Sequence, residues 1–388
     1  MEDSWNLTNK MLVDYVDCCF GETSNSWQNQ KSTIDYEKAY SELSQQTKGS
    51  GDLWFNESVE SACGCSTEDG PRYPSWPMGA RFALALTHDV DFVTSTTPHL
   101  YFFRRLERLL LGQGPRWQGI LCVLGSLYRI FTDIPRRERY GDLVDWMNLE
   151  HEKNVRSTFF FLPYGDGCLH IRDGDYRFED TIWFDKRKVK VSEAIKTIHD
   201  AGWEIGLHGT IRSAWEPGLL LKQKRQLESI IKAPIVSVRQ HYLSYDVYRT
   251  PSIQASAGFK FDSTHGFNTQ WGYPSGTCHP YPLWDSIEKQ ILDLIELPMA
   301  MMDVSERLPQ SSNNDLERLT ISGMNIISQV EQHMGALVLN WHPHYWSMGL
   351  AREIYEIMLN EGIRRKAYIG PLREVGEQRI IKRSNCNQ

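Results

Sequence analysis

The feature that most limits the fold of this 388-residue chain is a regular alternation between short apolar runs and segments with helical spacing. Strands that alternate with helices form parallel sheets with right-handed crossovers, and roughly seven consecutive units favour a closed barrel over an open sheet. We therefore predict an α/β fold of the barrel type. The predicted strands span 82–86, 156–162, 203–207, 235–238, 259–261, 292–297 and 336–339, and the predicted helices span 142–153, 191–201, 217–232, 248–257, 314–334 and 352–361.

Two stretches fall outside this alternation. Residues 1–78 are polar, rich in Ser, Asn and Gln, and carry only short apolar patches, so we expect an N-terminal extension that ends in a Pro-rich linker. Residues 79–388 would then form the barrel domain. The segment 164–190 is aromatic and charged, and we interpret it as an insertion between a strand and a helix.

Composition excludes several classes of protein. A hydrophobic content of 41% and a charged content of 23% are ordinary for a soluble globular protein, and a net charge of −7 argues against nucleic-acid binding. The eight cysteines include no CxxC pair, so neither a zinc ribbon nor a disulfide scaffold is indicated. With no signal-peptide pattern and no apolar run of membrane-spanning length, the expected location is cytoplasmic.

The segment 100–133 is apolar and basic, and it is predicted to be helical. Helices that pack on the core are the simpler interpretation. The alternative is a peripheral contact with an anionic or lipid-linked substrate. The oligomeric state is left open.

Charged and imidazole side chains follow five of the predicted strands at their carboxyl ends. Because these ends converge on one face of a parallel barrel, we expect the side chains to meet in one pocket. The residues are Asp89, Asp91, His208, Arg239, His241, Asp262 and His342.

These residue types suit metal-assisted hydrolysis of an amide. One carboxylate and imidazoles can hold a borderline ion such as zinc with open positions for water. A second carboxylate can remove a proton from that water, and a histidine on the opposite side can protonate the leaving amine. A nearby arginine would keep the base ionised.

Five segments carry a resemblance to a known family. In order along the chain they read THDVD (87–91), STFFF (157–161), EIGLHG (204–209), VRQHYL (238–243) and LNWH (339–342). They resemble the motifs of the polysaccharide deacetylases, the NodB-like enzymes of carbohydrate esterase family 4, and HDVD with RQHYL is similar to one bacterial branch. The resemblance covers about 82–343. It implies a distorted (β/α)7 barrel and metal-dependent removal of an N-acetyl group from an amino sugar or glycoconjugate.

The resemblance also implies roles for individual residues. Asp89 matches the catalytic base and Arg239 the residue that orients it, while His342 matches the general acid. Asp91 and His208 match metal ligands. Trp341, with Leu339, matches the lining of the acetyl pocket.

One position departs from the family pattern. Where members carry a second metal histidine four residues after the first, this chain has Arg212, a cation that cannot ligate a metal. We therefore expect His241 to be the third ligand, with His88 and His265 as further candidates, and zinc as the ion ahead of nickel, cobalt or manganese. Two alternatives remain: hydrolysis of a non-sugar amide or ureide on the same barrel, and a non-catalytic carbohydrate-binding relative with a degraded metal site.

Substrate contacts are expected from aromatic and polar residues near the motifs. The Gly- and Pro-rich segment 272–284 is predicted to form a loop over the barrel mouth, either as a rigid structural loop or with Thr277, Tyr281 and Trp284 in contact with substrate. Tyr242 and Trp341 complete the predicted substrate-binding set.

Overall fold

The computed structural model describes residues 76–93, 99–112, 120–121, 123–124, 143–164, 173–174, 176–285 and 287–385. The predicted extension over 1–78 lies almost wholly outside these ranges, as does much of the basic segment 100–133. No helix within the described ranges combines the length and the apolar character needed to cross a membrane.

The centre of the fold is one ten-stranded sheet, in which every neighbouring pair of strands is parallel except β8 and β9. Its order is β10-β11-β1-β2-β5-β6-β7-β9-β8, and β12 also pairs with β1. The strands are β1 (Ala83–Val90), β2 (Thr158–Phe161), β5 (Glu204–Gly209), β6 (Ser237–Gln240), β7 (Phe261–Asp262), β8 (Tyr281–Asp285), β9 (Gln290–Glu296), β10 (Met299–Met302), β11 (Ala336–Trp341) and β12 (Tyr368–Gly370).

A bend at Pro298 closes the sheet into a barrel. Strand β9 pairs with β7, whereas β10, which begins three residues after β9 ends, pairs with β11 at the other end of the sheet. If β9 and β10 are counted as one interrupted strand, the barrel has seven strands. The other six are β1, β2, β5, β6, β7 and β11. The predicted distorted (β/α)7 barrel is confirmed.

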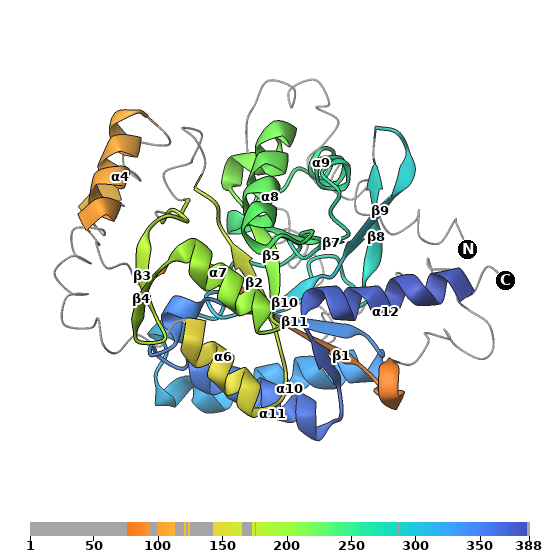
Figure 1. The fold of residues 1–388 in the computed structure, drawn as a ribbon. Helices are drawn as coiled ribbons and strands as arrows, with labels where there is room; N and C mark the ends of the chain where they lie inside the picture. The colour runs from red at the N-terminus through yellow and green to blue at the C-terminus, as the bar shows by residue number, and fades with distance from the viewer. Residues whose placement is uncertain are drawn as a thin grey trace.

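Helices surround the strands (Figure 1). Those that cover the barrel are α6 (Leu143–Glu152), α7 (Val191–Asp200), α8 (Pro217–Ile231), α9 (Thr250–Ser256), α10 (Leu316–Gln332) and α11 (Ala351–Arg364), close to their predicted ranges. Helix α4 (His99–Leu110) stands at the periphery. Helix α12 (Leu372–Asn385), strand β12 and the hairpin β3–β4 (Thr181–Phe184 and Arg187–Lys190) were not predicted.

Strand β1 shows how the sequence separates the two faces of the barrel. Leu84 and Leu86 pack in the core between strands and helices, whereas Ala83 and Ala85 pack in the interior cluster, where small side chains fit. The same alternation carries Asp89 to the interior and His88 to the helix-facing side. The spacing of two between Asp89 and Asp91 therefore keeps both carboxylates on the interior face.

Glu150 of α6 connects the helix layer to the barrel from a fully buried position. Its Oε1 accepts hydrogen bonds from His88 Nε2 at 2.8 Å and from Tyr355 Oη at 2.7 Å. Its Oε2 accepts from Ser157 Oγ and Trp203 Nε1, each at 2.7 Å. Four buried donors thus depend on one carboxylate, which offsets the cost of burying it.

A second buried carboxyl group contributes to the same helix-facing layer. Glu296, at the end of β9, is fully buried beside Asp262 of β7, its partner in the strand register. Burial and the neighbouring carboxyl raise the pKa of Glu296 well above its ordinary value, and burial raises that of Asp262 to about 6. The pair therefore holds a proton that the unfolded chain would release at neutral pH.

Replacing Glu150 by Ala should lower the free energy of unfolding by about 3–5 kcal/mol, because it leaves four buried donors without an acceptor. Urea unfolding followed by circular dichroism measures this. The matched control is Glu152→Ala on the exposed side of the same helix, expected to change stability by less than about 0.5 kcal/mol. Equal stabilities of the two variants would contradict the role given to Glu150.

Replacing Glu296 by Gln should change how stability depends on pH. The folded protein binds more protons than the unfolded chain above the unfolded pKa of Glu296, so its stability falls as pH rises from about 4.5 toward the raised folded pKa. The Gln variant lacks this proton, so its stability relative to wild type should rise between pH 5 and 8, by up to about 1.4 kcal/mol per pH unit. If urea unfolding gave the two proteins the same dependence of unfolding free energy on pH, the proton held by Glu296 and Asp262 would be contradicted.

Candidate metal centre and active site

Three side chains from separate strands meet at the carboxyl end of the barrel. Asp91 follows β1, His208 lies in β5, and His241 begins the short helix η4 (His241–Leu243) directly after β6. One potential ligand atom from each lies within 4.8 Å of the others. Oδ1 of Asp91 is 3.3 Å from Nε2 of His208 and 3.6 Å from Nε2 of His241.

The two imidazoles are oriented by acceptors behind them. Nδ1 of His208 lies 3.0 Å from the backbone oxygen of Arg239, and Nδ1 of His241 lies 3.0 Å from Oδ1 of Asp173. Because a carbonyl or carboxylate oxygen only accepts, each Nδ1 carries the proton and each Nε2 faces Asp91. Oδ1 of Asp91 is buried with no hydrogen-bond partner among the described residues. An aspartate oxygen and two imidazole nitrogens fit a divalent ion of the zinc type.

The electrostatics of this cluster favour a positive charge at its centre. Burial by itself would raise the pKa of Asp91, but the imidazoles of His241, His208 and His342 hold it well below its usual range. Burial would likewise lower the pKa of His241, but the carboxylates of Asp91 and Asp173 raise it to about 10.

Asp89 occupies the same interior face, one step deeper in the barrel. Its Oδ1 accepts a hydrogen bond from Nη1 of Arg239 at 2.9 Å, and its Oδ2 accepts from Nδ2 of Asn340 at 2.7 Å. Oδ2 also lies 3.8 Å from Nε2 of His208. Burial favours a higher pKa for Asp89, but the Arg239 guanidinium and the imidazoles of His208 and His342 together outweigh it and lower the pKa below its ordinary value. Asp89 is therefore an ionised carboxylate beside the candidate ligands.

His342 reaches the cluster from the end of β11. Its Nε2 lies 3.5 Å from Oδ2 of Asp91, and its Nδ1 lies 2.7 Å from Oδ1 of Asp303. Burial opposes protonation, but Asp303 and then Asp91 and Asp89 raise the pKa of His342 to about 9. Asp303 directly follows β10 and was not predicted as a site residue. It follows the carboxyl end of a strand, as the other site residues do, but β10 itself was not predicted.

The remaining histidine and arginine candidates lie away from the cluster. His88 contacts Glu150 on the helix-facing side, and His265 has its Nδ1 2.7 Å from Oη of Tyr281. Arg212 donates to Oε1 of Glu216 from Nε at 2.9 Å and from Nη2 at 2.6 Å. The expectation that Asp262 joins the pocket is wrong, because its side chain is fully buried beside Glu296 and its Oδ1 accepts a hydrogen bond from Thr264 Oγ1 at 2.5 Å.

Of the predicted substrate-binding residues, Tyr242 lies beside the site and Trp341 lies on the opposite face of its strand. Tyr242 is 50% exposed beside the site, with its ring centroid 4.6 Å from that of His241. Trp341 is fully buried on the helix-facing side of β11, and its Nε1 donates to the backbone oxygen of Ala351 at 2.7 Å.

The prediction of a loop over the barrel mouth at 272–284 is wrong. The backbone oxygen of Cys278, next to Thr277, accepts from the nitrogen of Ala336, the first residue of β11. Trp284 lies in β8, opposite Ile291 near the start of β9. The structure thus places Thr277 and Trp284 toward the amino ends of the strands, away from Asp91.

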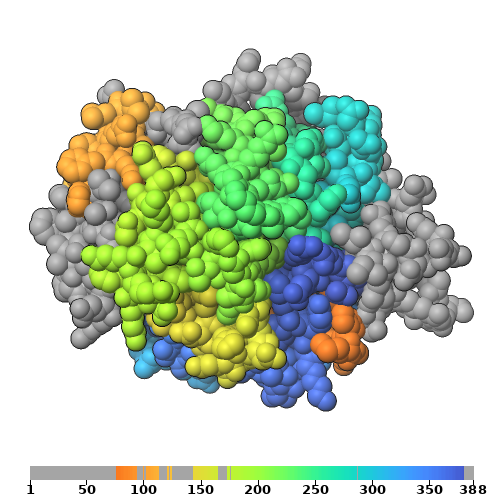
Figure 2. Space-filling view, in the orientation of Figure 1, coloured from red at the N-terminus to blue at the C-terminus, as the bar shows by residue number. Residues whose placement is uncertain are grey.

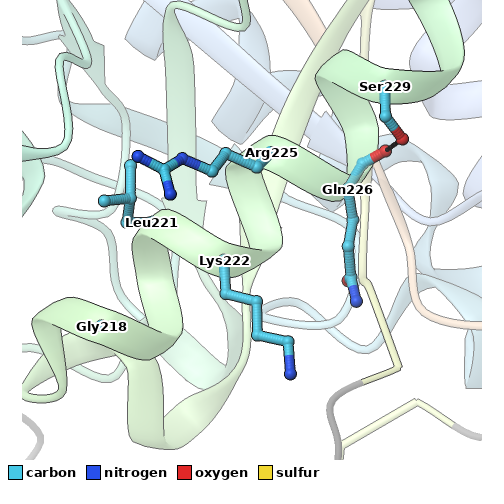
Figure 3. Close-up of a pocket in the computed structure, with 6 residues that line it drawn as sticks. All are labelled: Gly218, Leu221, Lys222, Arg225, Gln226 and Ser229. Atoms are coloured by element: carbon cyan, nitrogen blue, oxygen red, sulfur yellow. Dashed lines mark hydrogen bonds between the residues drawn. The ribbon is translucent and has the colours of Figure 1, made fainter.

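Two surface hollows lie outside the site. One of about 480 Å³ is lined by residues of α8 alone, from which Lys222 and Arg225 project (Figure 3). The other, of about 390 Å³, lies at the amino ends of β5 and β6 and includes Glu204 and Arg373. No candidate ligand or catalytic residue lines either of them.

Comparisons with known proteins give likenesses of structure. No family model and no curated protein sequence matches the chain. A protein from Mycobacterium smegmatis assigned as a polysaccharide deacetylase is 21% identical, with a TM-score of 0.49 over 80% of this chain and 94% of that one. PuuE allantoinase is 12% identical at 0.45, over 80% and 94%. A protein from Pseudomonas aeruginosa PAO1 assigned as a polysaccharide deacetylase is 13% identical at 0.45, over 79% and 94%.

At these identities the chemistry of this chain must be argued from its own residues.

Proposed function

We propose that this chain is a metal-dependent deacetylase that hydrolyses the N-acetyl amide of an amino sugar or glycoconjugate. The observation that carries the proposal is the convergence of a candidate ligand set, an ionised carboxylate and a protonated imidazole at one end of the barrel. Simple binding of a carbohydrate would not require these three chemical groups together.

Asp91, His208 and His241 would hold the ion, which we propose to be zinc. When bound, such an ion lowers the pKa of a coordinated water and polarises the amide carbonyl. Asp89 accepts the proton of the attacking water at its carboxylate, which Arg239 keeps ionised. His342 donates its Nε2 proton to the leaving nitrogen, and Asp303 at Nδ1 stabilises the imidazolium. The C–N bond breaks as the C–O bond forms, which releases acetate and the free amine.

Aromatic side chains at the rim support a sugar as the substrate. Tyr242 presents a half-exposed ring beside His241, and Tyr345 lies 5.7 Å from His342, measured between ring centroids. Aromatic rings close to a reacting centre suit the apolar face of a pyranose ring.

The ion pair between Arg212 and Glu216 favours an active enzyme over a binding protein with a degraded metal site. Arg212 was the sequence feature that suggested loss of the metal. Its guanidinium is neutralised by Glu216, and His241 offers the third nitrogen instead. A cation at position 212 therefore does not oppose a bound ion.

Replacing Asp89 by Asn should lower kcat for acetate release from N-acetylated amino sugars by about 100- to 10,000-fold, because the base is lost. Metal content should stay at the wild-type level, because Asp89 is not in the proposed ligand set. Thr277→Ala, toward the opposite end of the barrel, is the control and should retain full activity. An Asp89→Asn enzyme as active as wild type would refute the proposed base, and wild-type turnover of ureides alone would favour the non-sugar alternative.

Replacing His241 by Ala should lower the affinity for zinc by at least about 100-fold, because one of the proposed ligands is removed. Calorimetric titration of the metal-free protein measures this. The control is His265→Gln, which changes a buried histidine outside the cluster and should bind zinc as wild type does. Equal affinity of the His241 variant and wild type would show that the third ligand is another residue.

A further inference from the structure

Asp173 is the hydrogen-bond partner of His241 on the side of the imidazole that faces away from Asp91. It is fully buried, and its Oδ1 is 3.0 Å from Nδ1 of His241 and accepts a hydrogen bond from the backbone nitrogen of Ile211 at 3.0 Å. We propose that Asp173 is the positioning residue of the metal site and that Arg108 of α4 holds it in place, so that this peripheral helix sets the affinity for the ion. The inference rests on the proposed metal site and adds to it the segment that orients its third ligand.

His241 needs such a partner because no regular element fixes it. It begins a single turn of helix in which Tyr242 and Leu243 have φ values of 57° and 52°. Non-glycine residues in this left-handed region cost on the order of 1 kcal/mol each and persist only when their surroundings hold them. The carboxylate of Asp173 supplies that constraint: it selects the tautomer with the proton on Nδ1 and turns Nε2 toward Asp91.

Arg108 fixes the backbone that carries Asp173. This arginine is 2% exposed, and it donates from Nη1 to the oxygen of Asp173 at 2.8 Å and from Nη2 to the oxygen of Gly174 at 2.7 Å. A planar guanidinium on two successive carbonyls sets both the position and the direction of a short segment.

Gly174 brings the same segment against the first candidate ligand. A Cβ at this position would lie 2.6 Å from Cδ2 of Leu162 and 3.1 Å from the backbone oxygen of Asp91. The segment 173–174 therefore packs between α4 on one side and two of the three proposed ligands on the other.

Helix α4 is itself held to the barrel by charged and aromatic contacts. Arg104 donates to both carboxylate oxygens of Asp180, at 2.5 and 2.7 Å. The ring of Tyr164 lies under the guanidinium groups of Arg104, Arg108 and Arg177, at 5.5, 5.1 and 4.4 Å from its centroid. Figure 2 shows α4 in orange at the edge of the molecule, beside the yellow-green segment that contains Asp180. Of these α4 side chains, Arg108 hydrogen-bonds to the two residues that carry and follow the Asp173 carboxylate.

The test is calorimetric titration of the metal-free full chain with zinc. Asp173→Ala should weaken binding by about 10- to 100-fold, the usual effect of removing the partner of a metal-bound histidine, and Asp173→Asn by a smaller factor. Arg108→Met should weaken binding in the same direction. Arg225→Met, an exposed arginine on α8, is the matched control and should bind as wild type does.

A double-mutant cycle separates positioning from general structural damage. If Asp173 acts through His241, adding Asp173→Ala to His241→Ala should change the zinc affinity by less than about twofold. Equal losses in both backgrounds would overturn the inference, as would wild-type affinity in the isosteric Asp173→Asn and in Arg108→Met. A wild-type protein that binds no zinc would overturn the proposed function as well. Wild-type binding with unaffected variants would overturn only the role of Asp173.

The visible spectrum of bound Co²⁺ tests the positioning role, because a change in protein stability alone would not alter it. The visible spectrum of bound Co²⁺ depends on ligand number and geometry, so a reoriented His241 should change its bands in Asp173→Asn, whereas Arg225→Met should leave them unchanged. Identical spectra in wild type and Asp173→Asn would contradict the positioning role.

Discussion

The buried ion pair between Asp89 and Arg239 is the interaction around which the barrel mouth is arranged. Arg239 is fully buried, and it also donates to Thr87 Oγ1 and to the side-chain and backbone oxygens of Ser263. Phe160 lies under its guanidinium at 4.6 Å. Removing one partner of such a pair typically costs about 3–5 kcal/mol, so Asp89 and its neighbours are held in one geometry. The carboxylate is thereby ionised and fixed before any substrate arrives.

Most polar side chains of the candidate site are likewise oriented by hydrogen bonds to neighbouring groups. Carbonyl or carboxylate oxygens orient His208, His241 and His342, and an amide and a guanidinium orient Asp89. The exception is Oδ1 of Asp91, which is buried and has no hydrogen-bond partner within the described ranges. A buried acceptor of this kind at the centre of directed imidazoles is the feature that most favours a cation there.

The parts of the fold and site that the sequence predicted are those governed by strand periodicity. The strand ends located Asp91, His208, His241 and His342. The alternation of side chains along β11 would also have placed Trp341 away from the site. Its neighbour Asn340 faces the interior, where its side chain donates to Asp89.

What the sequence could not supply are contacts made by segments with no periodic signal. Asp173 lies outside the helices and strands of the insertion 164–190, and its link to Arg108 of α4 spans 65 residues. Thr277 and Trp284 were misplaced because Gly- and Pro-rich composition predicts a turn but not the end of the barrel where the turn lies. The bend at Pro298 was interpreted as the end of a strand, although the chain continues as β10 and closes the barrel.

The central claim is that Asp91, His208 and His241 bind one catalytic ion. Anomalous diffraction at the zinc edge from a crystal of the full chain grown with zinc tests it most directly. We predict one strong peak about 2.0–2.2 Å from an oxygen of Asp91 and from Nε2 of both histidines. No peak among these three side chains, or a zinc ion there without His241 as a ligand, would contradict the account.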